Sequence, residues 1–335
     1  MPAEPARIDL LFVLTPRALL LDLAGPAEAF RLANQHLKHA GRPACFRLRY
    51  TAVSEALETS VGLVVNGLEP LPARFDSPTW VVLLGQPSET LAEPSRAMHA
   101  TASWLGRCFA PALRDAAAGH RLLTICSGTL LAARAGLLGS HRCTTHHEML
   151  DELRTLAPSA QVVDNRVFVV DGPIASSAGV TAGIDLALHL VAQACGDAIA
   201  ASVAKDMVVY LRRTPNDPEL SPMLAHRHHL HPAVHRVQDA VSEQPTRDWD
   251  MASLSAVAHV TERHLQRLFA EHAGVSPLHY LERIRLEHAR QSLLRGASVT
   301  RAAEVAGFSS DLQLRRAWSR HLSGSPRDVV RSTHA

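Results

Sequence analysis

The sequence predicts two domains: an α/β domain with a doubly wound, mostly parallel sheet, followed by an all-α domain. Three observations predict this division. They are the length of 335 residues, the alternation of strand and helix patterns up to about residue 207, and purely helical patterns after a proline-rich stretch. A chain of this length with 47% hydrophobic residues can bury two separate cores. We place the first domain at 7–209, a linker at 210–230 and the second domain at 231–331.

Short apolar runs alternate with longer amphipathic segments through the first domain. The expected strands are 8–14, 79–85, 121–126 and 166–170, and the expected helices are 26–40, 94–117, 127–137 and 181–194. Alternation of this kind predicts a mostly parallel sheet with helices on both faces. The stretch "RRTPNDPELSP" at 212–222 then sets three prolines among polar residues, which indicates the interdomain linker.

Every pattern after the linker is helical. The expected helices are 232–243, 251–258, 261–272, 277–295, 298–306 and 309–321, with a final turn from Pro326. The domain also repeats itself. Val257-Ala258 recurs 48 residues later as Val305-Ala306, whereas Arg267, Phe269 and Pro277 recur 49 residues later as Arg316, Trp318 and Pro326. Two copies with one inserted residue predict a tandem helix-turn-helix; a generic helical bundle is the alternative.

Charge is distributed unevenly along the chain. The net charge is only +2, but residues 226–335 carry 15 arginines, no lysine and 11 acidic side chains. Guanidinium groups suit bidentate contacts to phosphate or to guanine edges. This basic region therefore favours a nucleic-acid partner, with a solvated basic surface as the alternative.

Metal, cofactor and membrane binding are not indicated. The five cysteines are scattered without a CxxC pair, so we expect reduced thiols, no zinc module and no cofactor. The histidine-rich stretch "HRHHLH" at 226–231 lacks helical spacing with acidic support, so we expect it to be solvated or close to DNA rather than metal-binding. The apolar N-terminal stretch is interrupted by charges and lacks a leader, and no run approaches the ~20 apolar residues of a membrane span. We expect a soluble, cytoplasmic protein.

Cys126 is the main candidate for chemistry in the first domain. The stretch "LLTICSGTLLAARAGLL" puts it on a sharp turn between a strand that ends at Ile125 and a helix that begins near Ser127. A helix N-terminus lowers the pKa of a nearby thiol. Cys126 is therefore a nucleophile, a residue of a ligand pocket, or a small residue that the bend tolerates. Farther along, Thr181 is an expected helix N-cap, where backbone N–H groups could also hold a ligand carboxylate.

The second domain resembles the AraC/XylS family of transcription regulators over 232–331. The matching stretches are "VTERHLQRLFAEHAGVSPLHYLERIRLEHARQSLL" and "EVAGFSSDLQLRRAWSRHLSGSP". The resemblance implies that the second helix of each helix-turn-helix enters the major groove of double-stranded DNA, with centres ~34 Å apart. In the first copy Leu265, Leu268 and Phe269 should be buried. That leaves Arg263, Gln266 and Arg267 as the expected DNA contacts.

The second copy departs from the family pattern. Leu314 and Trp318 stand where the family commonly has phenylalanine, and Val329 where it commonly has tyrosine. The expected DNA-binding residues of this copy are Asp311, Gln313, Arg315 and Arg316. The carboxylate of Asp311 repels phosphate, whereas Arg315 and Arg316 can anchor the phosphate backbone. We therefore expect the first copy to read bases more sharply and the second to contribute more backbone affinity.

The first domain resembles the PfpI-like, class I glutamine amidotransferase-like family, which has a flavodoxin-like fold. The resemblance covers about 7–207 and is carried by "LDLAGPAEAFRLA", "TICSGTLLAARAGLLGSHRCTTHH" and "SSAGVTAGIDLALHL". Chains that join this domain to AraC-type DNA binding form the GlxA-like regulators. The resemblance implies that His146 and Asp22 lie near the Cys126 thiol. The expected ligand-binding residues are Asp22, Gly85, Cys126, Ser127, His146 and Thr181.

Cysteine, histidine and a carboxylate are also the set that nucleophilic catalysis uses. Three features weigh against turnover: Gln86 follows Gly85 and its side chain should crowd an oxyanion hole, His147 stands where such regulators often have tryptophan, and sensing suits a DNA-binding fusion. We therefore expect a homodimeric regulator, not an enzyme, that binds promoter DNA, a small effector of the nitrogenous kind and RNA polymerase. The alternatives are a Cys-dependent hydrolase or hydratase fused to a DNA-binding domain, and an inert dimerisation domain.

Overall fold

The computed structural model describes residues 7–92, 94–179, 181–209, 226, 229, 231–294, 296–322 and 324–333. The chain divides into two compact units between Glu219 and Leu220, called here the first and second domains. Of the predicted linker at 210–230, all residues except 226 and 229 lie outside the described residues. Among the residues that are described, no helix is both long and apolar enough to cross a bilayer.

The first domain is built on a seven-stranded sheet, in the order β10-β11-β7-β6-β1-β2-β5. Its strands are β1 (Ile8–Val13), β2 (Phe46–Ala52), β5 (Glu69–Pro70), β6 (Thr79–Leu83), β7 (Arg121–Ile125), β10 (Phe168–Asp171) and β11 (Ile174–Ser177). All pair in parallel except β10, which runs antiparallel to β11. The run β2-β1-β6-β7-β11 has the flavodoxin-like strand order, so the predicted doubly wound fold is confirmed.

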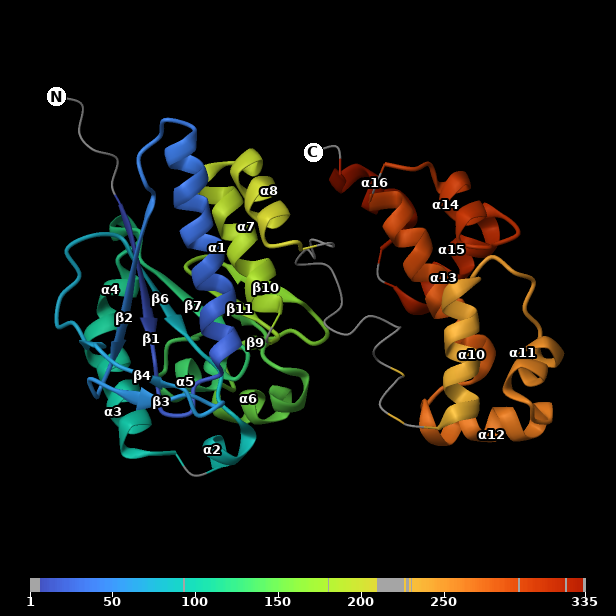
Figure 1. Cartoon of the computed structure of the whole chain (residues 1–335), viewed down its shortest axis with the longest axis horizontal. Coiled ribbons are helices and arrows are strands. Elements are labelled where there is room, and N and C mark those ends of the chain that lie inside the picture. Colours follow the sequence, from blue (N-terminus) through green and yellow to red (C-terminus); the bar gives the residue numbers. More distant parts are fainter. Residues whose placement is uncertain are drawn as a thin grey trace. The chain divides into compact units, whose positions relative to one another are not determined.

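Helices cover both faces of this sheet (Figure 1). On one face lie α1 (Leu20–His39), α7 (Ala182–Cys195) and α8 (Asp197–Asp206), and on the other α3 (Arg96–Trp104), α4 (Ala110–Arg114), α5 (Gly128–Arg134) and α6 (Leu150–Leu156). Side chains of β1 alternate between the two cores, with Leu10 and Phe12 in one and Leu11 and Val13 in the other. The period of two in a strand explains why this segment is apolar throughout.

Smaller elements complete the first domain. They are α2 (Ser88–Ala92), a π-helical turn at Leu105–Phe109, and the short strands β3 (Leu57–Glu58), β4 (Val64–Val65), β8 (Arg142–Cys143) and β9 (Gln161–Val162). One predicted boundary is wrong: α1 begins at Leu20, six residues before the expected start at Pro26. Proline is favoured in the first turn of a helix, but here the chain is already helical at Gly25, which packs closely against Ile184 of α7.

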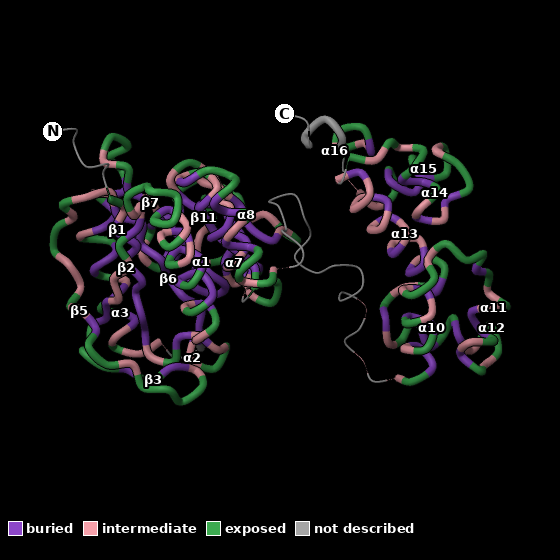
Figure 2. Tube along the Cα trace, turned by 45° about the horizontal axis from the view of Figure 1, so that its top comes forward, coloured by how far each residue is buried: buried purple, intermediate pink, exposed green. Residues whose placement is uncertain are grey.

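The second domain is helical throughout its described residues, as predicted. Its helices are α10 (Pro232–Glu243), α11 (Met251–Ala258), α12 (Glu262–His272), α13 (Pro277–Leu294), α14 (Val299–Val305), α15 (Asp311–His321) and α16 (Pro326–Thr333). One core lies under α10, α11 and α12, and a second under α14 and α15. Figure 2 shows the buried inner faces of these helices. The pairs α11–α12 and α14–α15 form the first and second helix-turn-helix.

Candidate ligand site and nucleic-acid interface

Cys126 sits on a strained turn at the carboxyl end of β7. Its φ is 53°, a left-handed conformation that costs a residue with a side chain on the order of 1–3 kcal/mol. Two buried hydrogen bonds hold the turn: the Cys126 N–H donates to the Ser177 carbonyl at 3.0 Å, and Thr145 Oγ1 donates to the Cys126 carbonyl at 2.9 Å. The sharp turn predicted for Cys126 is therefore present, with the side chain only 5% exposed.

Asp22 and Gly85 meet beside this turn. The Gly85 N–H donates to Asp22 Oδ2 at 3.0 Å. A Cβ atom at Gly85 would lie 2.7 Å from that oxygen and 2.8 Å from Cys126 Cβ, closer than packed atoms approach. Only glycine therefore lets the loop after β6, the start of α1 and the Cys126 turn come together.

The carboxyl group of Asp22 is only half satisfied. The residue is fully buried, and its Oδ1 atom has no hydrogen-bond partner among the described residues. Burial raises the pKa of Asp22 to about 7, and the Gly85 N–H opposes that rise only partly. Near neutral pH the group can therefore either accept a hydrogen bond or donate one through Oδ1.

His146 closes the other side of the Cys126 turn. A Cβ atom at Gly179 would lie 3.1 Å from His146 Cδ2 and 3.5 Å from Cys126 Sγ, so both side chains border Gly179. The His146 ring is 27% exposed, and its centroid is 4.2 Å from that of His147. The structure thus brings Asp22, Gly85, Cys126 and His146 to the carboxyl ends of β1, β6, β7 and β11.

Ser127 and Gln86 join two neighbouring loops. The Gln86 N–H donates to Ser127 Oγ at 2.8 Å, and this hydroxyl donates to the Gln86 carbonyl at 2.9 Å. The expectation that the Gln86 side chain crowds an oxyanion hole is wrong, because its Nε2 donates to the Pro16 carbonyl at 2.6 Å. The backbone N–H that such a hole would use is instead already bonded to Ser127, which also weighs against turnover.

Thr181 precedes α7, but it does not form the predicted side-chain cap. Its backbone is helical (φ −79°, ψ −24°), whereas an N-cap residue is extended when its side chain accepts from the helix. Close packing holds the start of α7 near the Cys126 turn, because a Cβ at Gly183 would lie 2.9 Å from Ile125 Cγ2.

Sequence reasoning missed the buried hydroxyl groups beneath the turn. Thr124 Oγ1 and Thr129 Oγ1 are 2.7 Å apart, and Thr129 Oγ1 donates to the Thr144 carbonyl at 3.0 Å. With Thr145, these side chains fix the Cys126 turn and the loop that carries His146 in one orientation. The available signal was the run "CTTHH", in which two threonines precede the histidines.

The recognition helix of the first helix-turn-helix, α12, has the predicted faces. Leu265, Leu268 and Phe269 are buried, which confirms the expected buried stripe. The expected DNA contacts Arg263, Gln266 and Arg267 are all exposed. Arg267 also contacts its own helix, with NH2 3.2 Å from His264 Nδ1 and NH1 3.7 Å from Glu271 Oε2.

In the second helix-turn-helix, two of the four expected DNA-binding residues of α15 form hydrogen bonds inside the domain. Thr300 Oγ1 donates to Asp311 Oδ2 at 3.0 Å, and the Ser309 N–H donates to Gln313 Oε1 at 2.7 Å. Both side chains therefore secure the start of the helix. Arg315 and Arg316 are exposed.

Three residues of the histidine-rich stretch are described, and they are packed rather than solvated. His226 Nδ1 is 2.9 Å from the Ala273 carbonyl, and the rings of His229 and His231 lie 4.6 Å and 4.7 Å from those of His235 and His272. Of the two expected alternatives, full solvation is therefore wrong for these residues, because they are half-buried against α10 and the end of α12, and closeness to DNA stays a prediction. Among the described residues, no group of three or more histidine, cysteine or acidic side chains could hold a metal ion.

Both domains match known families. The model of the DJ-1/PfpI family matches residues 109–193, and that of a helix-turn-helix domain matches 254–332. The first match contains Cys126 and His146, and the second contains all the candidate DNA contacts. The chain is therefore a protein with a DJ-1/PfpI domain followed by an AraC-type helix-turn-helix domain.

Proteins named as transcriptional regulators are similar to much of the chain. The chain is 29% identical to the HTH-type transcriptional regulator GlxA of Rhizobium meliloti, over 96% of this chain and 94% of GlxA. It is 31% identical to the regulator GbdR of Pseudomonas aeruginosa over 63% of this chain, an alignment that spans only 57% of GbdR. A shorter match, 44% identical over 85 residues, joins 25% of this chain to 36% of the isonitrile hydratase of Pseudomonas putida.

Proposed function

We propose that this protein is a sequence-specific, DNA-binding transcription regulator. The observation that carries the proposal is the exposed face of α12, where Arg263, Gln266 and Arg267 stand opposite a fully buried stripe inside a matched helix-turn-helix domain. Arginine and glutamine are the side chains that pair with guanine and adenine edges. The regulators similar to the chain along most of its length support this function over an enzymatic one.

We further propose that the first domain senses a small metabolite. The proposed ligand-binding residues are Asp22, Gly85, Cys126, Ser127, His146 and Thr181. The buried and unpaired Oδ1 of Asp22, beside the Cys126 turn, supports this role because a donor on a ligand would satisfy it. A nitrogenous effector supplies such donors. Homodimer formation, contact with RNA polymerase, a cytoplasmic location and the boundaries 7–209 and 231–331 belong to the same proposal.

A Cys-dependent hydrolase or hydratase fused to the DNA-binding domain is the second candidate. The strained φ of Cys126 and the nearby His146 favour it, as does the short similarity to the isonitrile hydratase. The bond between the Gln86 N–H and Ser127 opposes it, because that donor is not available to a reacting oxyanion.

Base reading is tested by substitutions on α12. Arg263→Ala and Gln266→Ala should each cost ~1–3 kcal/mol on the specific duplex and relax base preference there. Arg316→Ala should weaken binding to every duplex and reduce the salt slope by about one. Fluorescence anisotropy on specific and random duplexes measures both effects. Arg107→Ala, an exposed arginine of the first domain, is the control. Equal losses on both duplexes for the α12 variants would contradict base reading.

Sensing is tested at the Cys126 turn. Cys126→Ser, Asp22→Asn and His146→Ala should shift the effector response of promoter output while DNA binding persists, by the ~1–3 kcal/mol of a lost hydrogen bond to a charged group. Cys108→Ser is the matched thiol control. Product release from amides and related nitrogen compounds is assayed in parallel. Multiple turnovers that disappear in Cys126→Ser would establish the enzyme instead, and an unchanged response in all three variants would place the effector elsewhere.

A further inference from the structure

A cleft of about 630 Å³ lies at the other end of the sheet from Cys126. It opens at the amino ends of β7 and β11, whose first residues are Arg121 and Ile174. Cys126, in contrast, follows the carboxyl end of β7. Its volume is in the range of small-molecule sites, which is about 300–1,000 Å³. The residues that line it come from α4 and the segment after it, the loop between α5 and β8, and the turn between β10 and β11.

The floor of the cleft is apolar and its rim is cationic. Leu113, Leu137 and Ile174 are buried residues of the floor, and Arg114, His120 and Arg121 stand around them. The lining includes no aspartate or glutamate. A fourth basic residue, His141, is held by Asp171, with Nδ1 3.2 Å from Oδ2.

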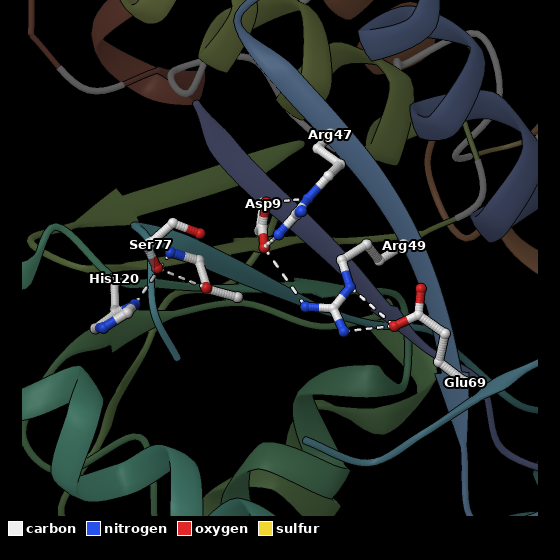
Figure 3. A network of polar contacts seen from close by, with 7 residues as sticks. Asp9, Arg47, Arg49, Glu69, Ser77 and His120 are labelled. Atoms are coloured by element: carbon white, nitrogen blue, oxygen red, sulfur yellow. Dashed lines mark hydrogen bonds and ion pairs between the residues drawn. The ribbon is translucent and has the colours of Figure 1, made fainter. Parts of the chain in front are cut away.

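The two arginines of the cleft differ from those nearby on β2. Figure 3 shows that Arg47 and Arg49 point at the carboxylates of Asp9 and Glu69, which neutralise them. Among the described residues, no carboxylate oxygen lies within 4.0 Å of the guanidinium of Arg114 or Arg121. Arg121 instead donates to the Gln193 side chain at 3.1 Å and lies over the ring of Trp80. Gln193 belongs to α7 and Trp80 to the core beneath α1 and α7, on the opposite face of the sheet from Leu113 and Ile174, so Arg114 carries the uncompensated positive charge of the cleft.

His120 adds a donor with a fixed orientation. The Thr79 N–H donates to His120 Nδ1 at 3.0 Å, so in the neutral ring the proton is on Nε2. Figure 3 shows this second nitrogen pointing away from the polar network. His120 is 8% exposed and lines the cleft, so its Nε2–H can donate to an acceptor there.

We propose that this cleft binds a small organic anion, a carboxylate with an aliphatic chain. The chain packs on Leu113, Leu137 and Ile174, and the carboxylate meets Arg114 and His120 Nε2–H. Charge-assisted hydrogen bonds of this kind are the strong ones, and the apolar floor supplies the remaining contact area. The site is separate from the proposed effector site at Cys126, so the first domain has places for two ligands at opposite ends of the strands of one sheet.

Three probes of equal chain length test the chemistry of the cleft. Isothermal titration of the full chain with hexanoate, 1-hexanol and 1-hexylamine isolates the charge of the head group. Hexanoate should bind at least tenfold more tightly than hexanol, and hexylamine most weakly, because Arg114 repels a cation. Inorganic phosphate, which has no apolar chain, should bind at least tenfold more weakly than hexanoate. Equal binding of the alcohol or the amine would overturn the anion site, and equal binding of phosphate would overturn the role of the floor.

Matched variants locate the site. Arg114→Gln should weaken hexanoate binding about five- to tenfold, whereas Arg107→Gln removes the same charge from an exposed position outside the cleft and should leave binding unchanged. Gly136 has φ 70° and open space where a Cβ atom would lie, so Gly136→Asn keeps the left-handed backbone and fills the cleft. This variant should abolish binding while circular dichroism stays native.

Cys126→Ser separates the two ligand sites. Hexanoate should bind this variant as it binds the parent chain, whether or not the effector proposal holds. Hexanoate binding that Cys126→Ser abolishes and Arg114→Gln leaves intact would overturn the cleft assignment and move the anion to the Cys126 turn.

Discussion

The two helix-turn-helix units make the same tight turn with different residues. His259 ends α11 with φ 56°, and Gly307, 48 residues later, follows α14 with φ 79°. A Cβ at Gly307 would lie 2.8 Å from Thr246 Cα and 2.9 Å from the Pro245 carbonyl. The second turn is therefore pressed against the loop between α10 and α11, where Arg285 also binds the Pro245 carbonyl at 2.8 Å. Both copies of the repeat therefore have the same left-handed turn. The turn at His259 has room for a side chain, whereas the loop packed against Gly307 leaves none.

The largest effect should come from giving the second turn a side chain. Gly307→Ala adds a methyl group against backbone atoms at a positive φ, so we expect a loss of about 3 kcal/mol or more in unfolding free energy. His259→Gly should change it by less than about 1 kcal/mol, because glycine adopts the left-handed conformation freely. Urea denaturation followed by circular dichroism measures both. Similar stabilities for Gly307→Ala and the parent chain would show that the loop yields and that the two turns are equivalent.

A smaller effect should come from the contact that holds α15 on α13. Glu282 of α13 accepts from Arg320 and His321, the latter at 2.6 Å, whereas Glu271 and His272 occupy the matching places in the first copy. Glu282→Gln should cost about 1 kcal/mol at pH 7.

The pH dependence of this contact has a definite sign. Burial raises the pKa of Glu282, but its bonds to His321 and Arg320 outweigh burial and leave the pKa below its usual value. A carboxyl group whose pKa is lower in the folded state stabilises the fold above its unfolded pKa of about 4.3, and this stabilisation is lost as the pH falls through the folded value. The variant should therefore lose less stability than the parent chain between pH 5 and pH 3. If Glu282→Gln and the parent chain lost the same stability between pH 5 and pH 3, the ionised Glu282 carboxylate would not be what stabilises this contact.

The smallest change in stability should come from giving the core of the second helix-turn-helix the phenylalanine that the first one has. Trp318 occupies the place that Phe269 has in the first copy, and its buried Nε1–H has no partner among the described residues. Trp318→Phe removes an unsatisfied donor but leaves a space, so the two terms largely cancel and we expect a change below about 1 kcal/mol. A melting curve that falls as far as that of Trp318→Ala would mean that the indole is essential to the second core.

The sequence predicts the second domain better than the first, for physical reasons. α10 begins at Pro232 and α11 follows the side-chain cap of Asp250, and both helices have the predicted bounds. Side chains also cap α12, α14 and α15. In the first domain β2 was missed, because Arg47 and Arg49 keep it from forming a continuous apolar run like β1 and β6, although Phe46, Leu48 and Tyr50 alternate with them as in a half-buried strand. The pairing of these arginines with Asp9 and Glu69 is not contained in any local pattern.

The candidate sites divide in the same way. The resemblance correctly anticipated that Asp22 and His146 lie close to Cys126, and the apolar spacing of α12 predicted its exposed arginines. The pairing of Gln86 with Ser127 depends on how two loops meet, and the cleft around Arg114 joins segments distant in sequence. Such features arise only when strand order is fixed, so local patterns do not contain them.

Helix α13 belongs to both helical cores, with Tyr280 and Ile284 in one and Leu286 and Leu293 in the other. Its 18 residues span about 27 Å at ~1.5 Å per residue, so the length of this helix fixes how far apart α12 and α15 lie. One inserted residue would rotate the second half by about 100° relative to the first. In the proposed complex with DNA, this rotation would turn α15 away from the side of the duplex that α12 faces, so the length of α13 sets the spacing between the two base-contacting segments.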